Sequence, residues 1–388
     1  MRPAVTHFAL PVLFIVILLF LLAAYISRHS SFYRQLLDLE ETSERYQSLD
    51  GLRGYLALGV VFCHIAVNYP YWQTGVWGYT PSRVINACGA ESVGFFFMIT
   101  AFLFWSRVVQ KDGVLDSFKF YVSRLRRLTP MYLVAATLTI LSALTLTDFH
   151  LQVALSDLVS QVVAWSLFTL PGEPDINGFH GTRLINTVFW SLVYEWQFYL
   201  LLPFLAFFVR TKSQWMLALI AGLCIRFYSD LHVEWYFISG CIAALLVRQE
   251  AVRRLANSWV GTILAIACIV GSVLLVPHDL SSVLAVVLFI PFITVASGNS
   301  LLGLLTSRPS RLLGMVSYSV YLLHNFILFW MSRLVNQRVA VGTMPWGWYW
   351  ALGATVAILT VVASSITYRF VEYPYLQPLH RAPAASAV

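Results

Sequence analysis

The residues of this sequence that stand out chemically are ionisable side chains within long apolar segments. Arg53 and His64 are eleven positions apart in a segment that opens with LDGLR at residues 49–53. Eleven residues at about 100° each come within about 20° of three helical turns, which places both side chains on one face, about 16 Å apart. A guanidinium can hold phosphate with two hydrogen bonds, and an imidazole can act as a general base. The pair is therefore a candidate site, the alternative being a snorkelling arginine and a structural histidine.

Two other apolar segments carry polar stripes at helical spacing. The stripes consist of Ser191, Glu195 and Tyr199 in one segment, and Ser317, Tyr321 and His324 in the other. An ionised group at bilayer depth costs about 2.5 kcal/mol or more, so Glu195 and His324 are candidates for function. Either could instead be a structural hydrogen-bonding group between helices. We expect the two stripes to line one shared cavity. Arg226 lies near a helix end, can reach lipid headgroups, and is the weaker candidate.

The densest basic cluster lies in residues 118–130 and includes Arg124, Arg126 and Arg127. Such a cluster beside an apolar segment commonly anchors the topology of a membrane protein. It could equally bind phosphate at the mouth of a helix bundle. The charge pattern alone leaves both interpretations open. Glu372 and Pro374, at the end of the last apolar segment, are expected to have a structural role.

The elements that must position these residues are membrane-spanning helices. The chain is 59% hydrophobic and 11% charged, with a mean hydropathy of +0.73, whereas soluble domains are about 45–50% apolar and about 25% charged. Apolar stretches of about 20 residues, enough to cross a bilayer, recur at 8–26, 52–69, 89–107, 130–147, 189–209, 213–229, 231–248, 258–277, 280–298, 312–333 and 346–368. The sequence therefore predicts an all-α, polytopic bundle of about eleven transmembrane helices. Residues 151–170 are expected to form a helix on the surface or lining a cavity.

Threading these helices with residues 28–51 in the cytoplasm puts 19 of the 25 Lys and Arg residues on the cytoplasmic side, as the positive-inside rule requires. This predicts an outer N-terminus and a cytoplasmic C-terminus. Residues 8–26 could be a secretory signal, but the charges follow the apolar run and no A-x-A-like site appears, which favours an uncleaved helix. We divide the chain into an N-terminal helix and connector (1–48), a membrane domain (49–376) and a tail (377–388).

Other features narrow the class of protein. The net charge of +7 favours contact with an anionic inner leaflet and says little about nucleic acid, which we do not expect as a partner. The five cysteines lack paired spacing, which argues against a disulfide framework and a zinc site, and we expect no bound metal. A transporter or flippase with a His/Glu proton relay is the rival interpretation. It predicts repeated helices broken by paired Gly or Pro, which the sequence does not contain.

Taken in order, these segments resemble the acyltransferase 3 family of membrane acyltransferases, from about residue 48 to residue 376. The matching positions are Leu49, Asp50, Gly51, Leu52, Arg53 and His64; Phe96, Phe97, Phe102 and Leu103; Arg124, Arg127 and Pro130; Trp190, Ser191, Leu192, Glu195, Phe198 and Tyr199; Ser317, Tyr318, Tyr321, Leu322 and His324; and Glu372 and Pro374. The chain departs from the pattern at Thr100-Ala101, where the family has Ser-Gly. It also has one helix before the ten-helix core that is commonest in the family.

The resemblance implies an O-acyltransferase of a bacterial inner membrane. It implies an acyl-CoA co-substrate, with acetyl-CoA the commonest donor, no permanently bound cofactor, and a carbohydrate or lipid-linked glycan as acceptor. The implied catalytic residues are His64, Arg53, Glu195 and His324, with His64 as base or transient acyl carrier. The implied acyl-CoA contacts are Arg53, Arg124, Arg126 and Arg127, and the implied acceptor contacts are Trp190, Ser191, Tyr199, Tyr318 and Tyr321. The acyl group, the acceptor hydroxyl and the oligomeric state stay open.

Overall fold

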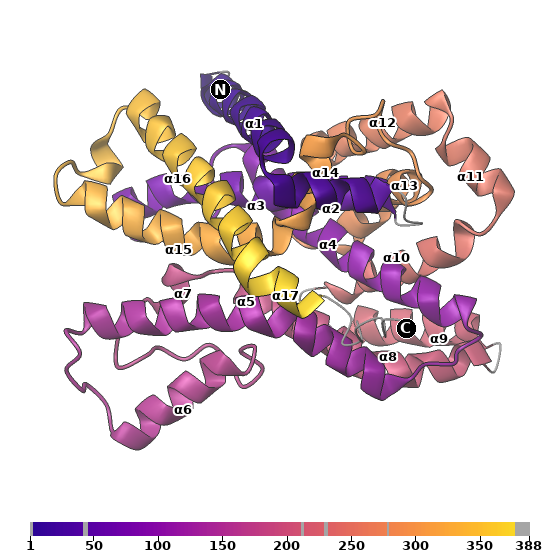
Figure 1. Ribbon diagram of the computed structural model, residues 1–388, viewed down its shortest axis with the longest axis horizontal. Coiled ribbons are helices and arrows are strands. Elements are labelled where there is room, and N and C mark those ends of the chain that lie inside the picture. Colours follow the sequence, from indigo (N-terminus) through magenta and orange to yellow (C-terminus); the bar gives the residue numbers. More distant parts are fainter. Residues whose placement is uncertain (1–2, 42–45, 211–212, 229–231, 278, 377–388) are drawn as a thin grey trace, which may run out of the picture.

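The computed structural model describes residues 3–41, 46–210, 213–228, 232–277 and 279–376, and these residues form helices joined by loops, without a β-strand among them (Figure 1). The predicted tail at 377–388 lies outside the described residues. The helices are α1 (Pro3–His29), α2 (Ser31–Glu41), α3 (Gln47–Thr74), α4 (Arg83–Gln110), α5 (Ser117–Leu146), α6 (Leu155–Ser166), α7 (Thr182–Ile185), α8 (Phe189–Arg210), α9 (Gln214–Tyr228), α10 (Glu234–Leu246), α11 (Glu250–Ala256), α12 (Trp259–Leu275), α13 (Ser282–Ala296), α14 (Arg308–Met315), α15 (Ser317–Asn336), the 3₁₀ turn η1 (Val341–Thr343), α16 (Trp346–Thr367), the π-helical turn η2 (Tyr368–Glu372) and α17 (Tyr373–Leu376).

The all-α, polytopic prediction is confirmed. Each predicted apolar stretch coincides with a helix among the described residues. Of these, six are long and apolar enough to cross a membrane, or eight if the bent pairs α11–α12 and α14–α15 each count as one span. The helices α9, α10 and α13 are shorter, at 13 to 15 residues. A helix satisfies its own backbone hydrogen bonds, which is why apolar segments adopt this form in lipid, and the protein is a multi-pass integral membrane protein.

The predicted surface helix at 151–170 is α6, which packs against α5 and lies outside the main bundle (Figure 1). One side of α6 is open, with Leu155 and Val159 more than half exposed. Its other side is held by Trp165, a fully buried side chain whose backbone carbonyl accepts a 2.6 Å hydrogen bond from the Tyr132 hydroxyl of α5. The sequence predicted that this helix lies either on the surface or along a cavity, and in the structure α6 lies on the surface.

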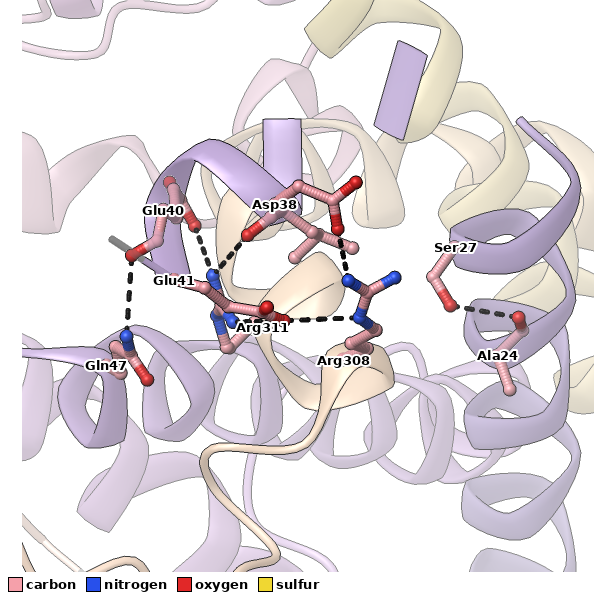
Figure 2. A network of polar contacts seen from close by, with 9 residues as sticks. Ala24, Ser27, Asp38, Glu40, Glu41, Gln47, Arg308 and Arg311 are labelled. Carbon is pink, nitrogen blue, oxygen red and sulfur yellow. Dashed lines mark hydrogen bonds and ion pairs between the residues drawn. The ribbon is translucent and has the colours of Figure 1, made fainter. Parts of the chain in front are cut away.

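The predicted polar connector contains α2, which is bound to α14 by ion pairs (Figure 2). Arg308 contacts Asp38 and Glu41, while Arg311, only 2% exposed, contacts Glu40 at 3.6 Å and Glu41 at 3.4 Å. The Arg311 guanidinium also donates to the Leu37 carbonyl at 2.9 Å. These contacts hold the start of the α14–α15 pair against the N-terminal part of the chain.

Close backbone contacts fix α3 against α14 and against the loop that precedes α14, and each depends on a glycine. A Cβ atom on Gly314 would lie 1.8 Å from the Asp50 carbonyl oxygen, and one on Gly51 would lie 1.8 Å from the Leu305 carbonyl oxygen. Any larger residue would force the backbones apart. The chain then bends by 66° between α14 and α15. The glycines of the LDGLRG segment therefore set the position of Arg53 relative to the polar stripe of α15.

The departure at Thr100-Ala101 is compensated on the neighbouring helix. Ala101 is fully buried, and the small residue at this contact is Gly240 of α10, where a Cβ atom would lie 2.3 Å from the Met98 carbonyl oxygen and 2.8 Å from the Ala101 Cβ atom. Small residues allow membrane helices to approach closely. The helices α4 and α10 therefore pack tightly although α4 has no glycine at this position.

Candidate active site

A cavity of about 400 Å³ lies between α3, α4, α5, α8, α14 and α15. We call it the arginine cavity, because the described residues lining it include Arg53, Arg107, Arg124 and Arg127. Acidic side chains also reach it, namely Glu40, Asp50 and Glu195. The remaining wall is mainly aromatic and aliphatic, and includes Phe96, Phe104 and Leu103. A cavity of this kind can hold a ligand that has both anionic and apolar parts.

The arginines of the cavity are held by different partners. Arg53 faces Asp50 of its own helix at 3.9 Å. Arg127 forms a 3.2 Å ion pair with the buried carboxylate of Glu372, which also accepts a hydrogen bond from Ser319. The pair ties α5 to the C-terminal turn η2, in line with the structural role expected for Glu372.

Arg124 lies with its guanidinium over the ring of Phe104, 4.6 Å from the ring centroid. A stacked guanidinium keeps its donors directed outward in the plane of the group, where they can bind an anion. The side chains of Arg124 and Arg127 line the cavity together. Their three-residue spacing on α5 places them on the same helix face.

The two polar stripes meet in this cavity, as predicted, except that His324 is not among its described lining residues. The Tyr321 hydroxyl donates to the Ser191 hydroxyl at 2.7 Å, and Ser191 in turn donates to the Val188 carbonyl at 2.9 Å. One turn along α8, Glu195 accepts hydrogen bonds from Thr100 at 3.2 Å and from the Tyr199 hydroxyl. Ser191, Glu195, Tyr199, Ser317, Tyr318 and Tyr321 all line the arginine cavity.

The two histidines contact each other although they are 260 residues apart in the chain. His64 Nδ1 lies 2.8 Å from His324 Nε2, and the rings stack at 24° with centroids 5.0 Å apart. His324 is 1% exposed, whereas His64 is half-buried. Neither ring lines the arginine cavity among its described lining residues; Tyr321, whose ring centroid is 6.2 Å from that of His324, lies between. Phe96 and Tyr321 both line the cavity, and their rings pack edge to face with centroids 5.8 Å apart.

The partners of the two rings determine which nitrogen carries a lone pair. His324 Nδ1 lies 3.1 Å from the Val320 carbonyl oxygen, which can only accept, so Nδ1 carries the proton. In a neutral ring, Nε2 of His324 is then an acceptor and receives the proton of His64 Nδ1. His64 Nε2 is left with an unshared lone pair, and it makes no hydrogen bond to the residues that the structure describes. This nitrogen is placed to act as a base.

The structure separates the predicted site residues into groups. Arg53, Arg124 and Arg127 share the arginine cavity, whereas Arg126 and Trp190 are not among its described lining residues. Arg126 lies about 100° around the helix from Arg127, which directs it to another face. Glu195, which the resemblance implies as a catalytic residue together with the histidines, lies in the arginine cavity next to Tyr199 and Thr100.

Sequence reasoning did not single out several residues of the site. Arg107 and Thr100 line the cavity from α4, and the Thr187 hydroxyl lies 3.4 Å from His64 Nδ1. The available signal for Arg107 was its position four residues after Leu103 and seven after Thr100, on one helix face. Thr187 precedes α8 in a loop segment, and no helical spacing pointed to it.

Comparison with known proteins identifies the family. The model of the Acyltransferase domain family matches residues 46–368. The chain is 26% identical to Acyltransferase MdmB of Streptomyces mycarofaciens over 391 residues, covering 88% of this chain and 95% of MdmB. It is 27% identical to Exopolysaccharide production protein ExoZ of Rhizobium meliloti over 323 residues, covering 77% of this chain and 92% of ExoZ.

O-acetyltransferase OatA of Staphylococcus aureus is 25% identical over 372 residues, covering 86% of this chain and 57% of OatA. No solved structure matches the chain at a significant level. The family match spans the helices that form the arginine cavity and both histidines. The chain therefore belongs to the Acyltransferase domain family, and it is an integral membrane acyltransferase.

Proposed function

We propose that this enzyme transfers an acetyl group from cytosolic acetyl-CoA to a hydroxyl group of a carbohydrate acceptor, such as a surface polysaccharide or exopolysaccharide. The observation that carries the proposal is that the His64–His324 pair lies next to the arginine cavity, with Tyr321, a lining residue, 6.2 Å from His324 between ring centroids. Among its relatives, one is named an O-acetyltransferase and another an exopolysaccharide production protein, which supports an acetyl donor and a carbohydrate acceptor.

The arginine cavity suits the donor. CoA has phosphate groups at one end and carries its thioester at the end of a long, flexible arm. Arg53, Arg107 and Arg124 can bind the phosphates, while the apolar wall contacts the arm. Arg53 and His64 are about 16 Å apart along α3, so the phosphates can stay at the arginines while the thioester approaches the histidines. Glu195 belongs to this donor side, where it holds Thr100 and Tyr199 in place.

His64 acts on the acceptor. Its Nε2 lone pair takes the proton of the acceptor hydroxyl as the hydroxyl oxygen attacks the thioester carbonyl carbon. The carbon–sulfur bond then breaks, and the CoA thiolate takes the proton back from His64. His324 stabilises the imidazolium that forms, because its Nε2 accepts the hydrogen bond from His64 Nδ1. A base in this position contributes about 10²–10⁴-fold to the rate.

The membrane position connects a cytosolic donor with an acceptor on the other side. We place the basic end of the bundle, with Arg53, Arg124 and Arg127, in the cytoplasm of a bacterium and the protein in its inner membrane, consistent with the positive-inside rule. The acceptor hydroxyl then reaches His64 from the opposite end. Holding both substrates in one low-dielectric site lowers the entropic part of the barrier.

The experiment that tests the function uses membranes that contain the full-length protein, acetyl-CoA radiolabelled in the acetyl group, and a panel of oligosaccharides and polysaccharides. Label in alkali-labile ester linkage to a carbohydrate, dependent on the protein, is the expected result. Label that stays on the protein after rapid denaturation, and that is absent from His64→Ala, would indicate a covalent acyl carrier at His64 instead of a general base. Absence of transfer to every carbohydrate, with the acetyl group still transferred to a different hydroxyl compound and CoA released as the free thiol, would contradict the carbohydrate acceptor.

A further inference from the structure

The surface of His64 that does not face His324 is covered by a loop at the end of the bundle opposite the arginines. This loop, residues 75–82, joins α3 to α4. Its Trp77 meets His64 edge to face, with ring centroids 5.6 Å apart and planes at 67°. The Thr187 hydroxyl approaches the same imidazole at 3.4 Å. His64, Trp77 and Thr187 are each half-buried, so this group keeps part of its surface open, unlike the buried His324.

The loop is held at both ends, so the position of Trp77 is built into the fold. At the start, Gly75 adopts a left-handed conformation with φ of 74°, and its amide donates to the Tyr71 carbonyl as the helix ends. At the other end, the Thr80 amide donates to the Asn86 side chain at 2.9 Å, and the Asn86 amide group donates back to the Thr80 carbonyl at 2.7 Å. These bonds fix the short stretch that carries Trp77.

Trp77 differs from the aromatic residues that usually mark a membrane interface. Interfacial tryptophans lie at headgroup level and face the lipid, as Trp348 at the start of α16 does, with 70% of its surface exposed. The loop neighbours of Trp77 follow that pattern too, since Val76 is 68% and Tyr79 is 73% exposed. Trp77 instead turns inward onto His64 and the ring of Tyr71, whose centroid is 5.8 Å away. An anchoring role does not explain this orientation.

We infer that Trp77 forms the wall of the acceptor subsite, where it packs against a sugar ring and holds the ring's hydroxyl beside the His64 imidazole. This inference rests on the proposed function, since it concerns the acceptor of that reaction. A pyranose ring has a face of C–H groups with a small positive charge, and the face of an indole ring is negative and apolar. The two surfaces are therefore complementary. Stacking uses the face of the sugar ring, so the hydroxyl groups at its edge can contact Thr187 and His64.

The arrangement also separates the two substrates. The donor approaches through the arginine cavity, whose lining includes Tyr321 and Phe96. The acceptor approaches past Trp77, on the side of His64 away from His324. A substitution at Trp77 should therefore change acceptor kinetics and leave donor kinetics as they are. A residue with a general structural role would affect both.

The test uses the purified full-length enzyme with radiolabelled acetyl-CoA and methyl glycosides of glucose, galactose and N-acetylglucosamine, with kinetic constants taken on the best of the three. We expect Trp77→Ala to raise the KM for the glycoside about tenfold and to leave the KM for acetyl-CoA unchanged. Trp77→Phe, which keeps an aromatic ring, should give a smaller increase. Trp348→Ala is the matched control for loss of an interfacial tryptophan and should behave as wild type.

Acetyl-CoA hydrolysis in the absence of glycoside reports whether each variant is folded. An unchanged glycoside KM in Trp77→Ala, or an equal rise in both KM values, would overturn the inference while the proposed function stands. A wild-type enzyme that hydrolyses acetyl-CoA but acetylates no carbohydrate would overturn the proposed function, and the inference with it.

Discussion

At the scale of single residues, the arginines of the donor site differ in how strongly they are already engaged. Arg127 is paired with the buried carboxylate of Glu372, and Arg53 faces Asp50. Arg124 stacks on Phe104 and donates a hydrogen bond to the Ser123 hydroxyl at 3.1 Å; both contacts are with uncharged groups, which bind a guanidinium less strongly than a phosphate does. Arg124 is therefore the arginine whose loss should most selectively weaken phosphate binding.

We expect Arg124→Gln to raise the KM for acetyl-CoA about 10–100-fold, because a hydrogen bond to a charged group contributes about 1.5–3 kcal/mol. The KM for acetyl-pantetheine, which lacks the nucleotide phosphates, should not change. Arg126→Gln is the control, since Arg126 lies two residues away and is absent from the described lining of the cavity. Equal effects of both variants, or an equal effect on both donors, would contradict a phosphate-binding role for Arg124.

Helical spacing predicted which side chains share a face, but it could not predict contacts between helices. Arg53 and His64 lie on one face of α3, and the stripes of α8 and α15 meet through Ser191 and Tyr321. The contact between His64 and His324 depends on the tertiary packing of α3 and α15, which are far apart in sequence. The same limit applies to Glu195, because its hydrogen bond from Thr100 of α4 forms only when α4 and α8 pack together.

At the scale of elements, ion pairs connect α2 to α14 beside the donor site, and we call this set of ion pairs the α2–α14 latch. The family match begins at residue 46, so α1 and α2 lie before the matched region. Arg308 and Arg311 of α14 bind the carboxylates of Asp38, Glu40 and Glu41 (Figure 2). Glu40 also lines the arginine cavity. The N-terminal helices therefore help to hold the α14–α15 bend that directs the α15 stripe into the site.

Removal of Arg311 should weaken this latch. We expect Arg311→Ala to reduce the free energy of unfolding by about 1–3 kcal/mol, less than for a fully buried pair because Glu41 can be hydrated when its partner is lost. The measurement is the melting temperature of the purified protein in detergent. Arg254→Ala, which breaks the exposed pair with Glu250, should have little effect. Equal melting temperatures of the two variants would argue against a stabilising latch.

The fold also shows how one helix compensates for a change in another. The sequence has Ala101 where the resemblance leads to glycine, which left the packing of α4 open. The structure has the glycine on the partner helix, at Gly240 of α10. A single sequence cannot reveal such a contact, because the two positions become neighbours only when the helices pack.

At the scale of the whole molecule, the charge is distributed unevenly along the bundle axis. The arginine cavity and the α2–α14 latch lie at the end where α3 begins, and the Trp77 loop follows the other end of α3. Apolar length and the positive-inside pattern predicted the helices and their threading from sequence. The helices α9, α10 and α13 have 13 to 15 residues, fewer than the about 20 that cross a bilayer as a single helix.

The proposed orientation predicts which loops are accessible from outside an intact cell. A cysteine introduced at Tyr79, which is 73% exposed in the loop between α3 and α4, should react with a membrane-impermeant maleimide in intact cells. A cysteine at Val114, which is 65% exposed between α4 and α5, should react only after lysis. The unsubstituted protein controls for its native cysteines. The reverse pattern would invert the threading and would place the arginine cavity on the wrong side for a cytosolic donor.

The central claim is that His64 is the base that activates the acceptor hydroxyl, and it is tested most directly by measuring acetyl transfer from labelled acetyl-CoA with wild type and His64→Ala at equal membrane abundance. We expect His64→Ala to lose about 10²–10⁴-fold in kcat while its KM for acetyl-CoA stays unchanged, because the donor binds in a cavity whose described lining does not include His64. Transfer at the wild-type rate by His64→Ala would show that His64 is not the base.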